Sequence, residues 1–401
     1  MSRDDTFPVP HGFLWGVSTA AHQIEGQNTN SDWWHKEHAA GTHIKEPSGD
    51  AADSYHRWPQ DMDLLAELGF TDYRFSIEWA RIEPVQGEFS RAQIAHYRRM
   101  VEGARARGLR PMVTLHHFTV PQWFAERGGW TAPGATDLFA RYVEAAAPVF
   151  ETGVAHVCTI NEPNIVAIFG AIDRLGVGAI GPAGLPLPDK DISAALIDAH
   201  RRAREVVKSI SPDIKVGWSV ATQACQALPG AERISAAYSW PREDVFVEAS
   251  RDDDWVGVQS YTRTRVGMDG PIPAPMDAER TLSGWEYYPP ALGEAVRHTA
   301  QIVPSVPIIV TENGISTSDD ARRIAYTKGA LKGLAEAMDD GIAVRGYFHW
   351  SALDNYEWGS YAPTFGLIAV DPATFERTVK ESGRWLGTMG RTARCSGTDE
   401  T

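Results

Sequence analysis

Short apolar runs recur along the chain at intervals that suit a buried parallel sheet. Eight such runs predict strands at residues 13–19, 73–79, 111–117, 156–161, 215–220, 255–261, 307–311 and 344–350. Several are apolar at nearly every position. Strands covered on both faces have this pattern, because neither face meets water.

Between most of these runs, the apolar residues follow a helical period. Residues 61–68 place Met62, Leu65 and Leu68 on one face, and Ser90-Arg91-Ala92-Gln93 has the form of a capping box before a helix that ends near Gly108. The same period predicts helices over 133–149, 191–207, 290–302, 319–338 and 372–385. Strands that alternate with amphipathic helices indicate a parallel sheet with helices on its faces.

The number of units favours a closed barrel over an open sheet. Eight strand–helix units predict one (β/α)8 TIM barrel of the α/β class, and no Gly-x-Gly-x-x-Gly motif follows any strand. A bare barrel needs about 250 residues, so we expect the extra length in long loops at the carboxyl ends of the strands. We predict one catalytic barrel domain over residues 1–390 and a polar tail over 391–401 that is disordered.

Composition excludes several classes of protein. A 43% hydrophobic content rules out a disordered or collagen-like chain, and three cysteines without metal-ligand spacing (Cys158, Cys225 and Cys395) predict reduced thiols. The net charge of −14 repels phosphate backbones and anionic lipid, so we expect neither nucleic acid nor membrane as a partner. Charges and prolines occupy the start of the chain, and no apolar run approaches the ~20 residues that span a bilayer, which predicts a cytoplasmic protein.

Polar residues follow the ends of most predicted strands. Because a barrel gathers its strand ends at one face, we expect these side chains to converge there. Glu162 and Glu312 follow the fourth and seventh strands and face each other across the barrel, and paired carboxylates of this kind perform glycoside hydrolysis. Each motif alone has a plain structural explanation: Asn-Glu-Pro can start a helix, and Thr-Glu-Asn-Gly can be an ordinary strand exit. The other convergent residues are Gln23, Glu25, Arg74, Glu78, His116, His117, Asn161, Tyr261, Asn313, Trp350, Asp354, Glu357 and Trp358.

The histidines and tryptophans give weaker evidence about the kind of site than the carboxylates do. His116 and His117 are adjacent, so only one of them can face the barrel interior, and we predict no metal site. Several of the 14 tryptophans fall in or beside loops, where flat aromatic faces suit the C–H faces of sugar rings. These are Trp33, Trp34, Trp123, Trp130, Trp285, Trp350 and Trp358.

Seven strings along almost the whole chain resemble glycoside hydrolase family 1, the β-glucosidase family. They occur in the family's order, which makes a chance match far less probable than a match to any one of them. The strings are GFLWGVSTAAHQIEG, YRFSIEWARIEP, VTLHHFTVPQW, TINEPN, GVQSYTR, VTENG and GYFHWSALDNYEWGSYAPTFGLIAVDP.

The resemblance implies a retaining β-glycosidase that removes terminal β-D-glucosyl or related residues from aryl or small natural-product glucosides. It implies Glu162 as general acid/base and Glu312 as nucleophile, with carboxyl groups about 5 to 5.5 Å apart. Arg74 and Tyr261 would hold Glu312. Sugar-binding side chains would be Gln23, His117, Asn161, Glu357 and Trp358, with Trp350 as an aromatic floor and Trp285 as a platform for the leaving group. No metal or organic cofactor is expected, because acid, base and nucleophile are all side chains.

The chain departs from the family pattern in places. Gln259-Ser260-Tyr261 stands where the family usually has Asn-Tyr-Tyr, and Phe118 stands where it has tryptophan. The stretches 220–254 and 312–323 are shorter than is usual in the family. Shorter loops lower the rim on the leaving-group side, which leads to the hypothesis that bulky aryl or natural-product aglycones are tolerated.

Three alternatives stay open. A transglycosidase uses the same carboxylates with an acceptor other than water. A 6-phospho-β-glycosidase is disfavoured because the charge of Glu357 repels phosphate. A silent sugar-binding barrel would have lost one carboxylate, and both stand here. The sequence does not choose between glucose, galactose and fucose, and it leaves the oligomeric state open.

Overall fold

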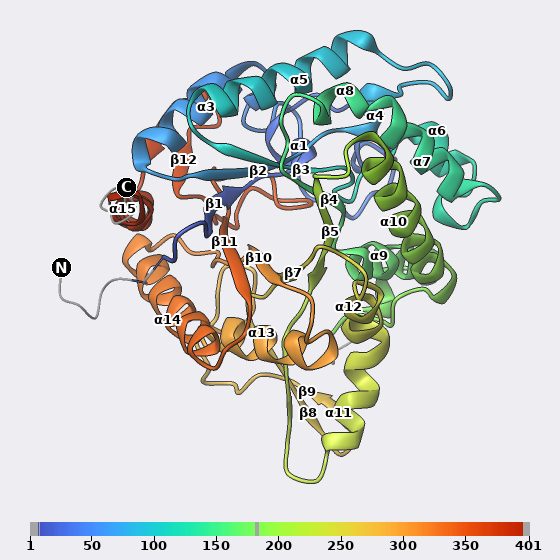
Figure 1. Cartoon of the computed structure of the whole chain (residues 1–401). Helices are drawn as coiled ribbons and strands as arrows, with labels where there is room; N and C mark the ends of the chain where they lie inside the picture. Colours follow the sequence, from blue (N-terminus) through green and yellow to red (C-terminus); the bar gives the residue numbers. More distant parts are fainter. Residues whose placement is uncertain (1–6, 8, 181–183, 396–401) are drawn as a thin grey trace.

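A computed structural model describes residue 7 and residues 9–180 and 184–395 of the chain. Eight parallel strands close into a barrel in the order β1-β11-β10-β7-β5-β4-β3-β2, and Figure 1 shows helices arranged around them. Each overlaps a predicted strand, so the (β/α)8 fold is confirmed. The strands are β1 (Leu14–Ser18), β2 (Asp72–Ser76), β3 (Arg110–Thr114), β4 (His156–Asn161), β5 (Lys215–Ala221), β7 (Trp255–Gln259), β10 (Ile308–Glu312) and β11 (Val344–Trp350).

The first and last barrel strands close the ring. Ser18 of β1 pairs with Arg74 of β2 on one side and with Trp350 of β11 on the other. A strand turns successive side chains to opposite faces, so one set packs toward the helices while a second buried cluster lies inside the barrel. That inner cluster consists of Leu14, Met112, Cys158, Trp255, Ile309 and Phe348.

The helices that cover the barrel agree with the periodicity in most places. Ser90 caps α5 by accepting a hydrogen bond from the Gln93 backbone N–H at 3.3 Å, as the capping-box sequence predicts. The predicted helix 133–149 is two helices, because Pro148 follows the break at Ala146. The long helices are α3 (Ser54–Leu68), α5 (Arg91–Ala106), α7 (Ala135–Ala145), α9 (Pro163–Leu175), α10 (Lys190–Ile210), α13 (Ala291–Ile302), α14 (Asp320–Asp339) and α15 (Glu381–Cys395).

Shorter helices lie in the connections. Gln23 lies on one of them, α1, which follows the first barrel strand after that strand stops at Ser18. The short helices are α1 (Ala21–Ile24), α2 (Asp32–Glu37), α4 (Trp79–Ile82), α6 (Gln122–Glu126), α8 (Ala147–Phe150), α11 (Glu232–Ser239) and α12 (Val245–Ala249). None of the helices in the described ranges combines the length and apolar character that a bilayer crossing requires.

The predicted helix over 372–385 is wrong in its first half. The chain there forms a hairpin of β12 (Ile368–Val370) and β13 (Arg377–Val379) before α15 begins at Glu381. The cause is tertiary: the buried guanidinium of Arg377 pairs with Asp61 of α3 at 2.8 Å. Helix α15 continues to Cys395, past the boundary predicted at residue 390, and residues 396–401 of the predicted tail lie outside the described residues.

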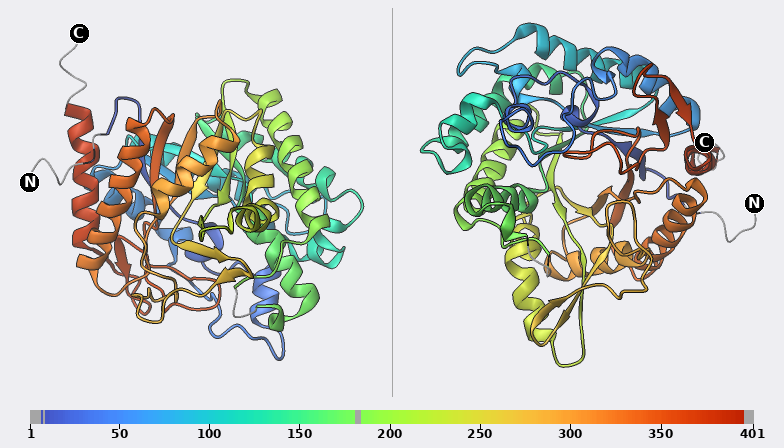
Figure 2. Two further views of the ribbon diagram at one scale, coloured as in Figure 1. Left: turned by 90° about the horizontal axis from the view of Figure 1, so that it is seen from below. Right: turned by 180° about the vertical axis from the view of Figure 1, so that it is seen from behind.

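A small three-stranded sheet lies beside the barrel, after strands β5 and β7. It contains β6 (Ala224–Ala227), β8 (Arg263–Gly267) and β9 (Gly270–Ile272), which follow barrel strands β5 and β7. Figures 1 and 2 show β8, β9 and α11 projecting from one side of the ring. The short segment between β7 and β8 therefore connects the carboxyl end of the barrel directly to this small sheet.

Candidate active site

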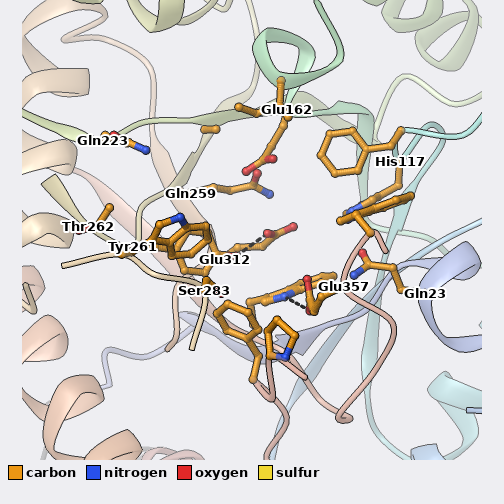
Figure 3. A pocket seen from close by; sticks show the side chains of 18 of the residues that line it. Gln23, His117, Glu162, Gln223, Gln259, Tyr261, Thr262, Ser283, Glu312 and Glu357 are labelled. Atoms are coloured by element: carbon orange, nitrogen blue, oxygen red, sulfur yellow. Dashed lines mark hydrogen bonds between the residues drawn. The ribbon is translucent and has the colours of Figure 1, made fainter. Parts of the chain in front are cut away.

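A cavity of about 520 Å³ lies at the carboxyl ends of the barrel strands. Nine of the eleven predicted site residues line it, and Figure 3 shows the carboxyl groups of Glu162 and Glu312 turned into the same space. The other two, Arg74 and Asn161, are fully buried and make hydrogen bonds to cavity residues. The nine are Gln23, His117, Glu162, Tyr261, Trp285, Glu312, Trp350, Glu357 and Trp358.

Glu312 is the last residue of β10 and is held at both carboxyl oxygens. The Arg74 guanidinium donates to Oε1 at 2.7 Å, and the Tyr261 hydroxyl donates to Oε2 at 2.7 Å. Burial raises the pKa of Glu312, while Arg74, Tyr261 and Gln259 each oppose that rise by stabilising the charged form. Glu312 is therefore the better-stabilised anion of the two facing carboxyls.

Glu162 lies between the end of β4 and the first turn of α9. Its backbone is left-handed, with φ +46°, and its N–H donates to the Ser219 carbonyl of β5 at 2.7 Å. Such strain in a non-glycine residue persists only where the surroundings enforce it, and Phe118 and Trp358, which also line the cavity, share it. These three side chains are thus fixed by backbone geometry as well as by packing.

The pKa of Glu162 is raised well above its usual value. Burial is the largest cause, and the negative charges of Glu312 and Glu357 add to it, while Arg74 partly opposes them. No side chain in the described part of the chain donates a hydrogen bond to this carboxyl group. Glu162 is consequently the carboxyl that retains its proton when Glu312 is charged.

The amide of Asn161 is fixed by hydrogen bonds from two neighbouring side chains. Its oxygen accepts hydrogen bonds from Arg74 Nη2 and from Gln259 Nε2, the latter at 2.8 Å. Its nitrogen then faces His117 Nε2 at 3.4 Å. Because a carbonyl oxygen has two lone pairs, these donors saturate it and fix the direction of the amide N–H groups.

Aromatic rings and amides form the wall around Glu357. The Trp350 indole donates to Glu357 Oε1 at 3.2 Å, and the His117 ring lies nearly parallel to those of Trp350 and Trp358, with interplanar angles of 14° and 10°. Burial and the charge of Arg74 lower the pKa of His117 well below its usual value, so the ring is neutral. Gln23 Oε1 and His117 Nδ1 are buried with no hydrogen-bond partner among the described residues, so both remain available to a polar ligand.

Trp285 lies at the open side of the cavity. It is 39% exposed, and its ring lies 5.4 Å from that of Tyr261 and 6.2 Å from that of Phe365. Trp123 and Trp130, which the loop positions had suggested as sugar contacts, instead pack against Trp79. Within the described ranges, no three His, Cys, Asp or Glu side chains are grouped as metal ligands would be.

Several cavity residues were not predicted. Gln223 follows β5 by two residues, so the strand-end rule that found the others would have found it as well. Gln259 had been noted only as a departure from a family motif. Apolar lining residues from helices and distant loops carry no sequence signal of this kind, and they are Phe118, Ile165, Phe169, Leu185, Pro363 and Phe365.

An eightfold barrel with a carboxyl pair at the carboxyl ends of its strands is an architecture of the glycoside hydrolases. The model of glycosyl hydrolase family 1 matches residues 4–239 and 250–394. The chain belongs to this family and is a β-glycosidase enzyme.

Known β-glucosidases match this chain along nearly its full length. The chain is 30% identical to β-glucosidase A of Thermotoga maritima, with 95% of this chain and 97% of that protein covered, and 31% identical to a β-glucosidase of Agrobacterium sp., with 95% of each covered. Among solved structures, the β-glycosidase BGL167 is 45% identical, with a TM-score of 0.88 over 96% of this chain and 97% of that one. A Thermotoga maritima β-glucosidase in complex with glucoimidazole has a TM-score of 0.87 at 27% identity, over 97% of this chain and 99% of that one.

Proposed function

We propose that this protein hydrolyses terminal β-D-glucosides, or closely related β-D-glycosides, with retention of configuration. The observation that carries the proposal is that two carboxyl groups in one cavity have different surroundings. Arg74 and Tyr261 stabilise the charge on Glu312. Burial and neighbouring negative charge favour the protonated form of Glu162. A retaining glycosidase needs one carboxylate and one carboxylic acid of this kind.

In the first half-reaction, a carboxylate oxygen of Glu312 attacks the anomeric carbon. The bond from that carbon to the aglycone oxygen breaks, its electron pair goes to the leaving oxygen, and the proton of Glu162 is transferred to it. The aglycone leaves as an alcohol or phenol, and the sugar is esterified to Glu312.

In the second half-reaction, Glu162 acts as a base. Esterification removes the negative charge of Glu312, which is one cause of the raised pKa of Glu162. The carboxylate of Glu162 accepts a proton from water while the water oxygen attacks the anomeric carbon and the ester bond to Glu312 breaks. Two inversions give net retention, so the β-anomer is the first product.

The side chains around Glu357 suit an unphosphorylated sugar. Gln23, His117, Asn161 and Glu357 offer donors and acceptors for hydroxyl groups, while the rings of Trp350 and Trp358 offer flat apolar faces. None of the cavity-lining residues in the described ranges is a lysine or an arginine, so the lining offers no side-chain cation to pair with a phosphate group. These features support a neutral glycosyl group over a 6-phosphoglycosyl group.

The cavity also has an apolar part to its lining, which supports aryl or small natural-product aglycones. Trp285 and Phe365 offer aromatic faces there, and Ile165, Phe169 and Leu185 add apolar surface. Aglycone breadth is measured as kcat/KM over a series of β-glucosides of increasing aglycone size. Values that fell steeply with size would contradict this specificity.

Azide rescue of the two glutamate variants tests the mechanism. Glu312→Ala should lose hydrolysis of 4-nitrophenyl β-glucoside by more than about 10⁴-fold and regain turnover with azide, yielding the α-glycosyl azide, because azide replaces the nucleophile. Glu162→Ala should retain turnover of activated aryl glycosides and yield the β-glycosyl azide. Near-normal turnover by Glu312→Ala, or the opposite anomers, would overturn the assignment of roles.

A further inference from the structure

The residue after Trp285, Glu286, forms an ion pair with Arg263 that has no role in the two half-reactions. Arg263, the first residue of β8, donates from Nε to Glu286 Oε2 at 3.0 Å and from Nη2 to Oε1 at 2.6 Å. The pair is bidentate, and the two side chains are only 20% and 9% exposed. Parallel hydrogen bonds of this type fix orientation as well as distance.

The guanidinium of Arg263 is also held from its other sides. Its Nη1 donates to Gln226 Oε1 at 3.0 Å, and its plane lies 4.1 Å from the centre of the Tyr288 ring. Gln226 and the Tyr288 hydroxyl both donate to Glu294, at 2.7 Å each, which connects the arrangement to α13. Arg263 is thus a rigid support and not a mobile surface side chain.

This support is joined by the backbone to both parts of the active site. Tyr261, two residues before Arg263, donates to the nucleophile Glu312, while the Thr262 hydroxyl donates to the Glu286 carbonyl at 2.8 Å. Glu286 is the residue after Trp285. The segment 261–263 therefore contacts both parts of the site. Its first side chain bonds to the nucleophile, and its second and third side chains bond to Glu286, beside Trp285.

We propose that Arg263 and Glu286 are positioning residues that hold the Trp285 indole against the leaving-group side of the cavity, and that the subsite thereby selects planar aromatic aglycones. This inference rests on the proposed function. A partly exposed tryptophan in a loop loses rotational freedom when an aglycone stacks on it, and that loss weakens binding. The ion pair fixes the backbone that carries the indole before the substrate binds. Less backbone freedom is then lost on binding, and only aglycones that stack on the indole benefit from this.

A double-mutant cycle tests the proposal. Arg263→Met, Trp285→Ala and the double variant are compared by kcat/KM on 4-nitrophenyl β-glucoside and methyl β-glucoside. Arg263→Met should lower kcat/KM for the aryl substrate about 10-fold and for the methyl substrate at most about 2-fold. In the Trp285→Ala background, the same change should lower the aryl value by less than about 2-fold, because Arg263 acts through the indole.

Arg297→Met is the control, since it removes an arginine–carboxylate pair between Arg297 of α13 and Asp340, the residue after α14, and neither residue lines the cavity. It should change neither substrate by more than about 2-fold. Multiplicative losses in the double variant, or equal losses on both substrates, would overturn the proposal. If Arg263→Met does not fold, Arg263→Lys enters the same cycle, because it keeps the charge and loses the bidentate geometry. Failure of the wild-type protein to cleave either glucoside would instead overturn the proposed function.

Discussion

Gln259 controls which way the amide of Asn161 faces. It supplies one of the two donors to the Asn161 oxygen, and Arg74 supplies the other. With both lone pairs occupied, the Asn161 N–H groups point toward His117, and we expect the N–H that does not bond to His117 to be available to a sugar hydroxyl beside the anomeric carbon. Hydrogen bonds to the 2-hydroxyl strengthen in glycosidase transition states.

Gln259→Leu should therefore lower kcat/KM for 4-nitrophenyl β-glucoside about 10-fold or more. The loss for the 2-deoxyglucoside should be smaller, since that substrate lacks the hydroxyl in question and keeps only the part of the loss that comes from the hydrogen bond of Gln259 to Glu312. Gln259→Asn, which restores the residue usual in the family, is the matched control for the amide. Equal losses on both substrates would show that Gln259 does not act through the 2-hydroxyl.

The charge of Glu312 also has a measurable effect on its partner. Because that charge raises the pKa of Glu162, Glu312→Gln should lower the pKa of Glu162 by about 1 unit or more. Nuclear magnetic resonance of carboxyl-labelled protein measures this titration without requiring activity. In the wild-type enzyme, kcat/KM should fall as pH rises through the raised pKa of Glu162, since the acid then loses its proton. A Glu162 titration unchanged by Glu312→Gln would contradict the electrostatic coupling.

At the scale of single residues, the sequence predicted the polar part of the site better than the apolar part. Glu162, Glu312 and Glu357 follow barrel strands, so their positions in the chain already place them at one end of the fold. Phe169 lies on α9 and Leu185 in a loop, where an apolar residue has the same appearance whether it packs in a core or lines a cavity. Only the three-dimensional structure separates those two cases.

Among the secondary-structure elements, α15 shows why the prediction for 372–385 failed. This helix carries glycines at 383, 387 and 390 on the face that meets the rest of the molecule. Its position depends on close backbone approach, and its start depends on the β12–β13 hairpin and the buried Arg377–Asp61 pair. Helical periodicity reports amphipathic faces, and it contains no information about such distant contacts.

Gly387→Ala should destabilise the protein although alanine favours helices. A Cβ atom at Gly387 would lie 2.3 Å from the Leu68 carbonyl oxygen at the end of α3, and a backbone atom cannot move aside as a flexible side chain can. We expect a loss of about 1–3 kcal/mol in the free energy of unfolding, measured by urea denaturation. Gly178→Ala, where a Cβ would meet nothing within 4 Å, is the control and should change stability by less than about 0.5 kcal/mol. An increase in stability for Gly387→Ala would contradict the close contact.

For the whole molecule, the order of elements was predictable because several barrel strands are nearly continuous apolar runs that alternate with amphipathic helices. The additions to the barrel were not, since β6, β8 and β9 are short and partly exposed. These additions carry the proposed positioning contacts, because Arg263 lies in β8 and Gln226 in β6. The barrel could thus be predicted from the sequence, while the small sheet beside it required the structure.

The closure of the ring between β1 and β11 has a consequence for biosynthesis. Gln23 follows the first barrel strand, whereas Glu357 and Trp358 follow the last, so the sugar-binding wall joins segments made at opposite times during translation. A nascent polypeptide that has emerged only as far as β10 already contains both glutamates, Gln23 and His117, but it lacks Glu357 and Trp358. The complete lining of the cavity can therefore form only after β11 and the loop that follows it have been synthesised.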